Sequence, residues 1–166
     1  MNGQNRGQKA DLPPLVKAMV HGADVIPPEQ TLERISKAKG GTMTRVLTVD
    51  DSKSMRQMIK FTLETAGMDV VEMPDGKEAY EWAQKNVSPD VILADINMPI
   101  MDGLTLIKHL RQLPEYAKTP ILMLTTDASS GKKMEGKETG ATGWIVKPFH
   151  PEHLIETIQK VIRNKK

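Results

Sequence analysis

The stretch VLTVDD, residues 46–51, shows most directly how this chain folds and where its chemistry lies. Four strand-forming residues run without interruption into two adjacent aspartates. Three later stretches have the same design: VILAD (residues 91–95), ILMLTT (residues 121–126) and WIVKP (residues 144–148). Short apolar runs between helical segments are typical of buried parallel strands. Ligands bind beyond the carboxyl ends of such strands, so we expect the residues that follow these runs to form one site.

The order of the segments predicts an α/β fold with a parallel sheet and helices on both of its faces. From Met43 onward, strand and helix patterns alternate five times, with the second strand expected over residues 69–73. Residues 154–162 have apolar side chains at helical spacing, whereas residues 129–140 predict a weak, polar helix interrupted by glycine. Alternation of this kind implies right-handed crossovers that place helices on either side of the sheet.

Composition and charge exclude several classes of function. The chain has no cysteine, which rules out disulfides and Cys-based metal sites. It has no 18-residue apolar stretch and no signal-peptide core, so we expect a cytoplasmic protein without a membrane partner. The net charge of +2 arises in residues 1–42, because residues 43–166 contain 17 basic and 17 acidic side chains. A neutral body of this kind does not predict a nucleic-acid partner.

The residues at the four strand ends suit phosphoryl transfer. Asp50, Asp51 and Asp95 would repel one another and should bind a hard divalent cation, for which Mg²⁺ is the natural choice. Asp95 would attack phosphorus as a covalent nucleophile. Lys147 would hold one oxygen of the moving phosphoryl group, and the Thr125 hydroxyl would donate to another. A purely structural alternative is that Asp50 and Asp51 cap the helix that follows them.

Residues 43–166 resemble a CheY-type receiver domain, the response regulator module of bacterial two-component signalling. The motifs that carry the resemblance are VDDS (residues 49–52), DINMPIMDG (95–103), LTT (124–126), and the segment from GA (140–141) to KPF (147–149). The resemblance implies a five-stranded, flavodoxin-like, doubly wound sheet with the strand order 2-1-3-4-5. It does not include residues 1–42, for which we expect an N-terminal extension that is helical or linker-like.

The resemblance also implies the residues that bind and hydrolyse the phosphoryl group. Asp95 is expected to be the phosphoacceptor. Asp51 and Asp95 are expected to ligate Mg²⁺, with Asp50 acting through a water molecule and Asn97 through its main-chain carbonyl. Asn97 and Asp127 each follow a site position by two residues, and we expect them to tune dephosphorylation.

A second set of residues is implied to sense the phosphoryl group. Thr125 would be the switch hydroxyl and Lys147 the cation that pairs with the phosphate. The peptide bond between Lys147 and Pro148 is expected to be cis. Trp144 occupies the position of the switch aromatic residue, which is usually Tyr or Phe in the family. Because Trp is bulkier, an inward orientation of its ring needs more room, and a plain core role is the alternative.

The function implied is that of a phosphorylatable single-domain response regulator. It would accept a phosphoryl group from a sensor histidine kinase of the chemotaxis type and then lose it by autodephosphorylation, acting on no other substrate. The chain ends 17 residues after Phe149, which predicts a stand-alone receiver. Its partner, such as a flagellar motor switch component, is expected to bind the face formed by the polar helix, the last strand and the last helix.

Other functions remain open at this point. A phosphorelay intermediate or phosphate sink would return the phosphoryl group to a histidine phosphotransferase. An aspartate-nucleophile phosphatase usually carries a second Asp two residues after the nucleophile, and here that residue is Asn97, which cannot transfer a proton. A nucleotide-binding enzyme is rejected, since residues 50–53 contain two acids and no glycine-rich loop.

Residues 1–42 allow two interpretations. One is a leader that precedes the receiver at Met43. The other is a docking segment that covers the signalling face, with an apolar stripe formed by Leu12, Leu15, Val16, Met19 and Val20.

Overall fold

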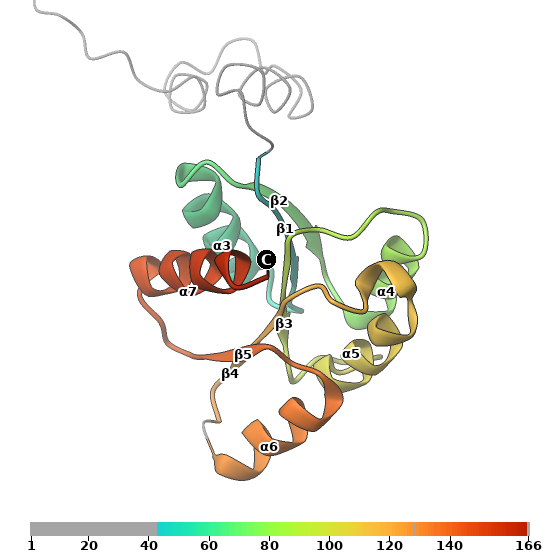
Figure 1. Ribbon diagram of the computed structural model, residues 1–166. Coiled ribbons are helices and arrows are strands. Elements are labelled where there is room, and N and C mark those ends of the chain that lie inside the picture. Colours follow the sequence, from blue (N-terminus) through green and yellow to red (C-terminus); the bar gives the residue numbers. More distant parts are fainter. Residues whose placement is uncertain (1–42, 128, 166) are drawn as a thin grey trace, which may run out of the picture. The chain divides into compact units, whose positions relative to one another are not determined.

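Strand β1 (Arg45–Val49) lies inside a five-stranded parallel sheet, because β2 (Asp69–Met73) pairs with one of its edges and β3 (Val91–Asp95) with the other. Strands β4 (Ile121–Thr125) and β5 (Gly143–Val146) extend the sheet beyond β3 (Figure 1). The computed structural model describes residues 43–127 and 129–165. The strand order is β2-β1-β3-β4-β5, which confirms the expected doubly wound, CheY-like fold.

The apolar runs form strands because they are covered on both faces. All five residues of β3 and all five of β4 are buried. Helices α3 (Lys53–Thr65) and α7 (Pro151–Arg163) cover one face of the sheet, and α4 (Gly76–Ala83) and α5 (Gly103–Gln112) cover the other (Figure 1). Two separate apolar cores result, one on each face.

Three helices begin at a side-chain cap near the carboxyl ends of the strands, where the site lies. Ser52 caps α3, Asp75 caps α4 and Asp102 caps α5, and each side chain accepts a hydrogen bond from a backbone N–H in the first turn. The alternative interpretation of Asp50 and Asp51 as helix caps is therefore wrong. Ser52 is closer to the helix start, and its hydroxyl oxygen lies 3.3 Å from the Met55 N–H nitrogen.

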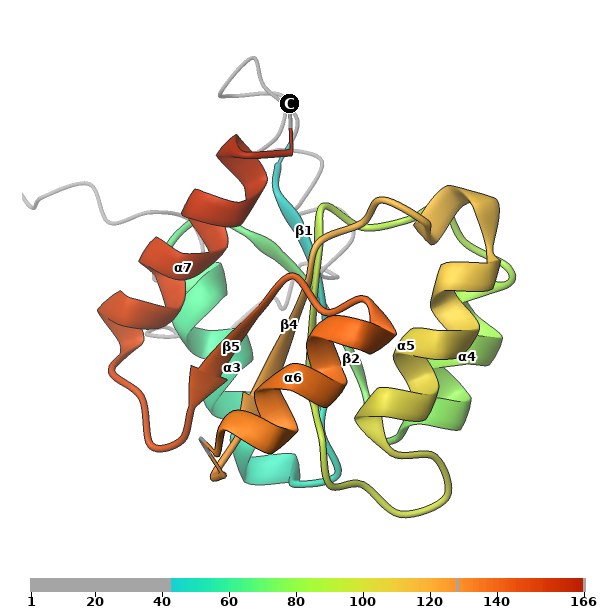
Figure 2. The same cartoon turned by 60° about the horizontal axis from the view of Figure 1, so that its bottom comes forward.

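Helix α6 (Ser130–Thr139) lies beside α5 near the β5 edge of the sheet (Figure 2). Its N-cap residue, Ser129, makes no side-chain capping hydrogen bond. At the other end, Gly140 has the left-handed φ of 105° that terminates many helices. A short 3₁₀ helix, η1 (Pro114–Tyr116), follows α5.

The described residues contain no helix with the length and apolar character needed to cross a bilayer. Both interpretations of residues 1–42 concern a segment outside the described residues.

Candidate active site

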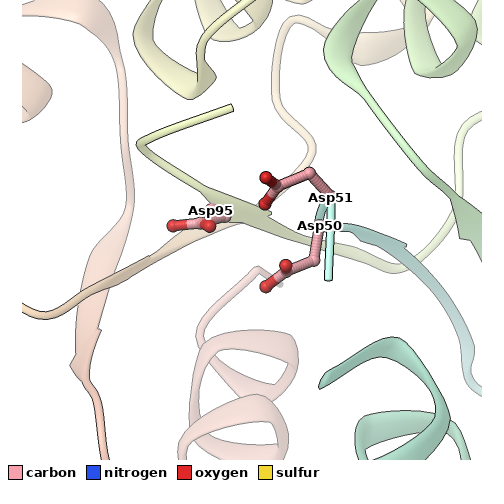
Figure 3. Close-up of side chains that lie close together, drawn as sticks. All are labelled: Asp50, Asp51 and Asp95. Carbon is pink, nitrogen blue, oxygen red and sulfur yellow. The ribbon is translucent and has the colours of Figure 1, made fainter. Parts of the chain in front are cut away.

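The site lies where the sheet changes winding direction, between β1 and β3. Asp50 and Asp51 follow β1 directly, and Asp95 is the last residue of β3. From β1 the chain crosses over to β2 on one side, while β3 pairs with β1 on the other side. Ligands of open α/β sheets usually bind at such a point, beyond the carboxyl ends of the strands. One carboxylate oxygen from each aspartate lies within 4.8 Å of the other two (Figure 3).

Asp50 is fully buried and is held by several hydrogen bonds. Its Oδ1 accepts a hydrogen bond from the Ser52 N–H at 2.8 Å, and its Oδ2 accepts one from the Lys147 ammonium at 3.1 Å. The main-chain carbonyl of Asp50 accepts a hydrogen bond from Arg56 at 2.7 Å. Arg56 was not predicted, since nothing in its sequence context distinguishes it from an ordinary surface arginine. Together these contacts hold the loop after β1 in place.

Lys147 brings positive charge into the cluster of carboxylates. Its Nζ lies 3.1 Å from Asp50 Oδ2 and 3.4 Å from Asp95 Oδ2, and only 13% of its side chain is exposed. The peptide bond to Pro148 is cis. Repulsion among the acids is therefore partly relieved by Lys147, which lies 97 residues from Asp50 along the chain.

Asp95 is nearly buried, and this burial raises the pKa of its carboxyl group above the ordinary value. The negative charge of Asp50 raises the pKa further. The ammonium of Lys147 and the backbone N–H of Asn97 act in the opposite direction. Asp95 is thus a poorly solvated carboxylate, in contact with a cation and open to a ligand at the edge of the sheet.

Thr125 is the last residue of β4 and is also buried. Its hydroxyl donates a hydrogen bond to the main-chain carbonyl of Asp127 at 3.0 Å and accepts one from the N–H of the same residue at 2.9 Å. The Asp127 carboxylate accepts a hydrogen bond from the Ser129 N–H at 2.8 Å. Thr125 is therefore connected, through Asp127, to the residue that precedes α6.

The remaining predicted residues lie around this centre. The side chains of Asp51, Asn97 and Asp127 are exposed. Trp144 lies on β5, half-buried, and packs against the core that includes α5. Oxygen donors dominate the site, and three carboxylates in close proximity match the ligands that Mg²⁺ prefers in proteins.

Comparison with known proteins identifies the family of this chain. The model of the response regulator receiver domain matches residues 46–159. The chain belongs to the response regulator receiver family. The receiver is 40% identical over 119 residues to a chemotaxis protein CheY homolog of Campylobacter jejuni, which covers 71% of this chain and 92% of that protein.

Solved receiver structures show the same architecture. The structure of the chemotaxis response regulator CheY4 of Vibrio cholerae is 54% identical, with a TM-score of 0.69, covering 72% of this chain and 99% of that one. The receiver domain of the sensor histidine kinase PA1611 from Pseudomonas aeruginosa is 26% identical, with a TM-score of 0.68, covering 73% and 98% respectively. That structure has a magnesium ion coordinated in its active site cleft.

Proposed function

We propose that this receiver is a phosphorylatable response regulator of a chemotaxis system, with Asp95 as the residue that accepts the phosphoryl group. The observation that carries the proposal is the Lys147 ammonium, which contacts Asp95 and Asp50 where three carboxylates meet. A lysine with only 13% of its side chain exposed compensates charge where a dianionic group would bind. The similarity to CheY homologues supports the chemotaxis assignment.

In the proposed reaction, Asp95 takes the phosphoryl group from a phosphohistidine of a sensor kinase. A carboxylate oxygen of Asp95 forms a bond to phosphorus while the bond between phosphorus and the histidine nitrogen breaks. The electron pair of that bond leaves with the imidazole, and the product is an acyl phosphate. Lys147 pairs with an oxygen of the transferred group and stabilises the charge that spreads over it.

Mg²⁺ is the proposed cofactor. Asp51, Asp95 and the main-chain carbonyl of Asn97 would hold it directly, and Asp50 would do so through a water molecule. When bound, it supplies positive charge that offsets the repulsion between the carboxylates and an incoming phosphoryl group. The magnesium ion in the Pseudomonas receiver supports this assignment.

The hydroxyl of Thr125 would report phosphorylation to the rest of the domain. It has a single proton, which is donated to the Asp127 carbonyl. Donation to a phosphoryl oxygen would therefore break that hydrogen bond. Because Asp127 also binds the Ser129 N–H, the change would reach the start of α6.

The downstream partner is proposed to bind the face formed by α6, β5 and α7, and a flagellar motor switch component is the proposed occupant. A groove of about 470 Å³ lies next to this face, between β5, the C-terminal half of α7 and the segment that leads into β4. Its lining residues include Lys118, Thr142, Trp144, Thr157 and Lys160. Acidic side chains on a partner would complement the lysines of this groove, which are Lys118, Lys160 and Lys165.

Hydrolysis of the acyl phosphate would end the signal. Asn97 and Asp127 lie exposed beside the site, where they can orient an attacking water molecule. We propose that the protein catalyses only its own phosphorylation and dephosphorylation, and that it does so in the cytoplasm.

The test uses a histidine kinase labelled with radioactive phosphate, mixed with the full chain and Mg²⁺. The label is expected to move to the receiver, and alkali should release it as from an acyl phosphate. Asp95→Asn should accept no label. The matched control is Asp90→Asn, at the residue directly before the same strand. Wild-type labelling of Asp95→Asn would overturn the assignment of the phosphoacceptor.

A further inference from the structure

Helix α6 has a glycine at its point of contact with the sheet. Gly136 is buried, and it is the only buried position among residues 133–139. A Cβ atom built on Gly136 would overlap the indole atoms Cζ2 and Cη2 of Trp144. The space that a side chain would occupy at position 136 is therefore filled by the ring of Trp144.

A glycine in this position is unfavourable for the helix by itself. Alanine is the better residue in a helix interior, because glycine has more backbone freedom to lose. Position 136 also has a helical φ, since it is not among the glycines with positive φ. Backbone conformation therefore does not require glycine at this position, and the contact with Trp144 is the feature that does.

The C-terminal end of α6 is held in place, so the helix cannot shift freely to admit a side chain. The Arg111 guanidinium donates to the Gly140 carbonyl from Nη2 at 2.7 Å and from Nε at 3.2 Å. The Gly136 carbonyl accepts hydrogen bonds from the N–H groups of Gly140 and Ala141. The contact with Trp144 thus lies next to an anchored end of the helix.

We propose that Gly136 is a positioning residue that forms the seat of the Trp144 indole and couples the ring to α6. With the seat occupied, the ring cannot turn toward α6 unless α6 moves away, and α6 cannot approach the sheet unless the ring moves. The position of the ring therefore limits how closely α6 approaches the sheet. The link to signalling rests on the proposed function, whereas the packing itself does not depend on phosphorylation.

The test is a double-mutant cycle with Gly136→Ala and Trp144→Phe, analysed by thermal unfolding. Phe lacks the atoms that a Cβ at position 136 would overlap. Gly136→Ala is expected to lower the Tm when Trp144 is present and to raise it in the Trp144→Phe background. Gly136→Ala in the Trp144→Phe background is the control for Gly136→Ala in the presence of Trp144, because both measurements contain the same change in helix propensity.

Fluorescence measures the ring directly. In a Trp82→Phe background, Trp144 is the only tryptophan in the chain. Gly136→Ala should then shift the Trp144 emission to longer wavelength and increase its quenching by acrylamide, whereas Glu138→Ala, on the exposed side of α6, should do neither. Phosphorylation by the kinase is expected to change the Trp144 emission in the Trp82→Phe protein. This change should be lost when Gly136→Ala is added.

An increase in Tm by Gly136→Ala in both backgrounds would overturn the proposal, as would a loss of folding in both. If Gly136→Ala fails to fold only when Trp144 is present, the proposal is supported. If the protein that retains Gly136 accepts no label, the proposed function is overturned instead. The double-mutant cycle of Tm values, measured without phosphorylation, would still decide the role of Gly136.

Discussion

At Asp95, burial and local charge act in opposite directions. The carboxyl group is nearly removed from water, which disfavours its charge, while Lys147 and the backbone N–H of Asn97 favour it. Burial prevails, so the pKa of Asp95 is raised. The folded protein therefore holds this proton more tightly than the unfolded chain does, and ionisation of Asp95 weakens the fold.

A pH-dependent stability difference should follow for Asp95→Asn in Mg²⁺-free buffer. Wild type should lose stability, relative to the variant, as pH rises from below the ordinary aspartate pKa of 3.8 through the raised folded value. The loss is about 1.4 kcal/mol for each unit by which the pKa is raised. Urea unfolding at several pH values measures it. A difference that shifts in favour of wild type as pH rises would contradict this account.

Ile100 has a backbone conformation that its side chain disfavours. Its φ is 71°, in the left-handed region, and 76% of the residue is exposed. A β-branched side chain in this region costs about 1–2 kcal/mol, and little packing is available to offset that cost.

Ile100→Asn is therefore expected to stabilise the protein by about 1 kcal/mol, since Asn tolerates the left-handed region. The free energy of unfolding in urea is the measurement. Val87→Asn is the matched control, because Val87 is also β-branched and is 66% exposed but has no positive φ. It should change stability by less than about 0.5 kcal/mol. Equal effects of the two substitutions would show that strain at Ile100 is not the cause.

Helix α5 is joined to its neighbours by Arg111, whose guanidinium donates hydrogen bonds to main-chain carbonyls outside the helix. Arg111 Nη1 donates to the carbonyls of Tyr116 and Thr119 at 2.7 and 2.8 Å, while Nη2 binds Gly140. Burial lowers the pKa of the Arg111 guanidinium. Its planar set of donors connects α5 to the loop around η1 and to the end of α6.

Arg111→Met should destabilise the protein by about 3 kcal/mol, because half-buried carbonyls would lose a charged donor. Arg111→Lys should also lower the free energy of unfolding, since an ammonium lacks the planar set of donors that reaches these carbonyls. Lys108→Met, at an exposed position of the same helix, is the control and should cost less than about 0.5 kcal/mol. Chemical denaturation measures all three. Full rescue by lysine would mean that charge alone, rather than geometry, is required.

For the molecule as a whole, Met43–Lys166 forms a unit with its own two cores. A chain that starts at Met43 is accordingly expected to fold, to have the same Tm as the full chain, and to accept label at the same rate. Thermal unfolding and the labelling assay check this. Aggregation of the shorter chain, or loss of labelling, would show that residues 1–42 belong to the domain.

Local patterns of the sequence predict much of the fold. The apolar runs at residues 46–49, 91–94, 121–124 and 144–146 lie in strands that occupy adjacent positions in the sheet. Such runs are recognisable because burial on both faces demands uninterrupted apolar side chains. Since parallel strands end at one edge, the run pattern also predicted that Asp50, Asp51 and Asp95 would meet. The strand order, by contrast, came from the resemblance to the family.

Other features depend on distances between elements, which no local pattern encodes. The run pattern placed Lys147 in the same site as Asp50, but it could not show that the two side chains pair directly. Nor could it show that Arg56 binds the carbonyl of Asp50 or that Arg111 joins α5 to Gly140. It also could not show that Gly136 is buried against Trp144, because a glycine in a polar helix looks like a simple interruption. These contacts form only when the helices pack on the sheet, where close packing decides which side chain occupies each space.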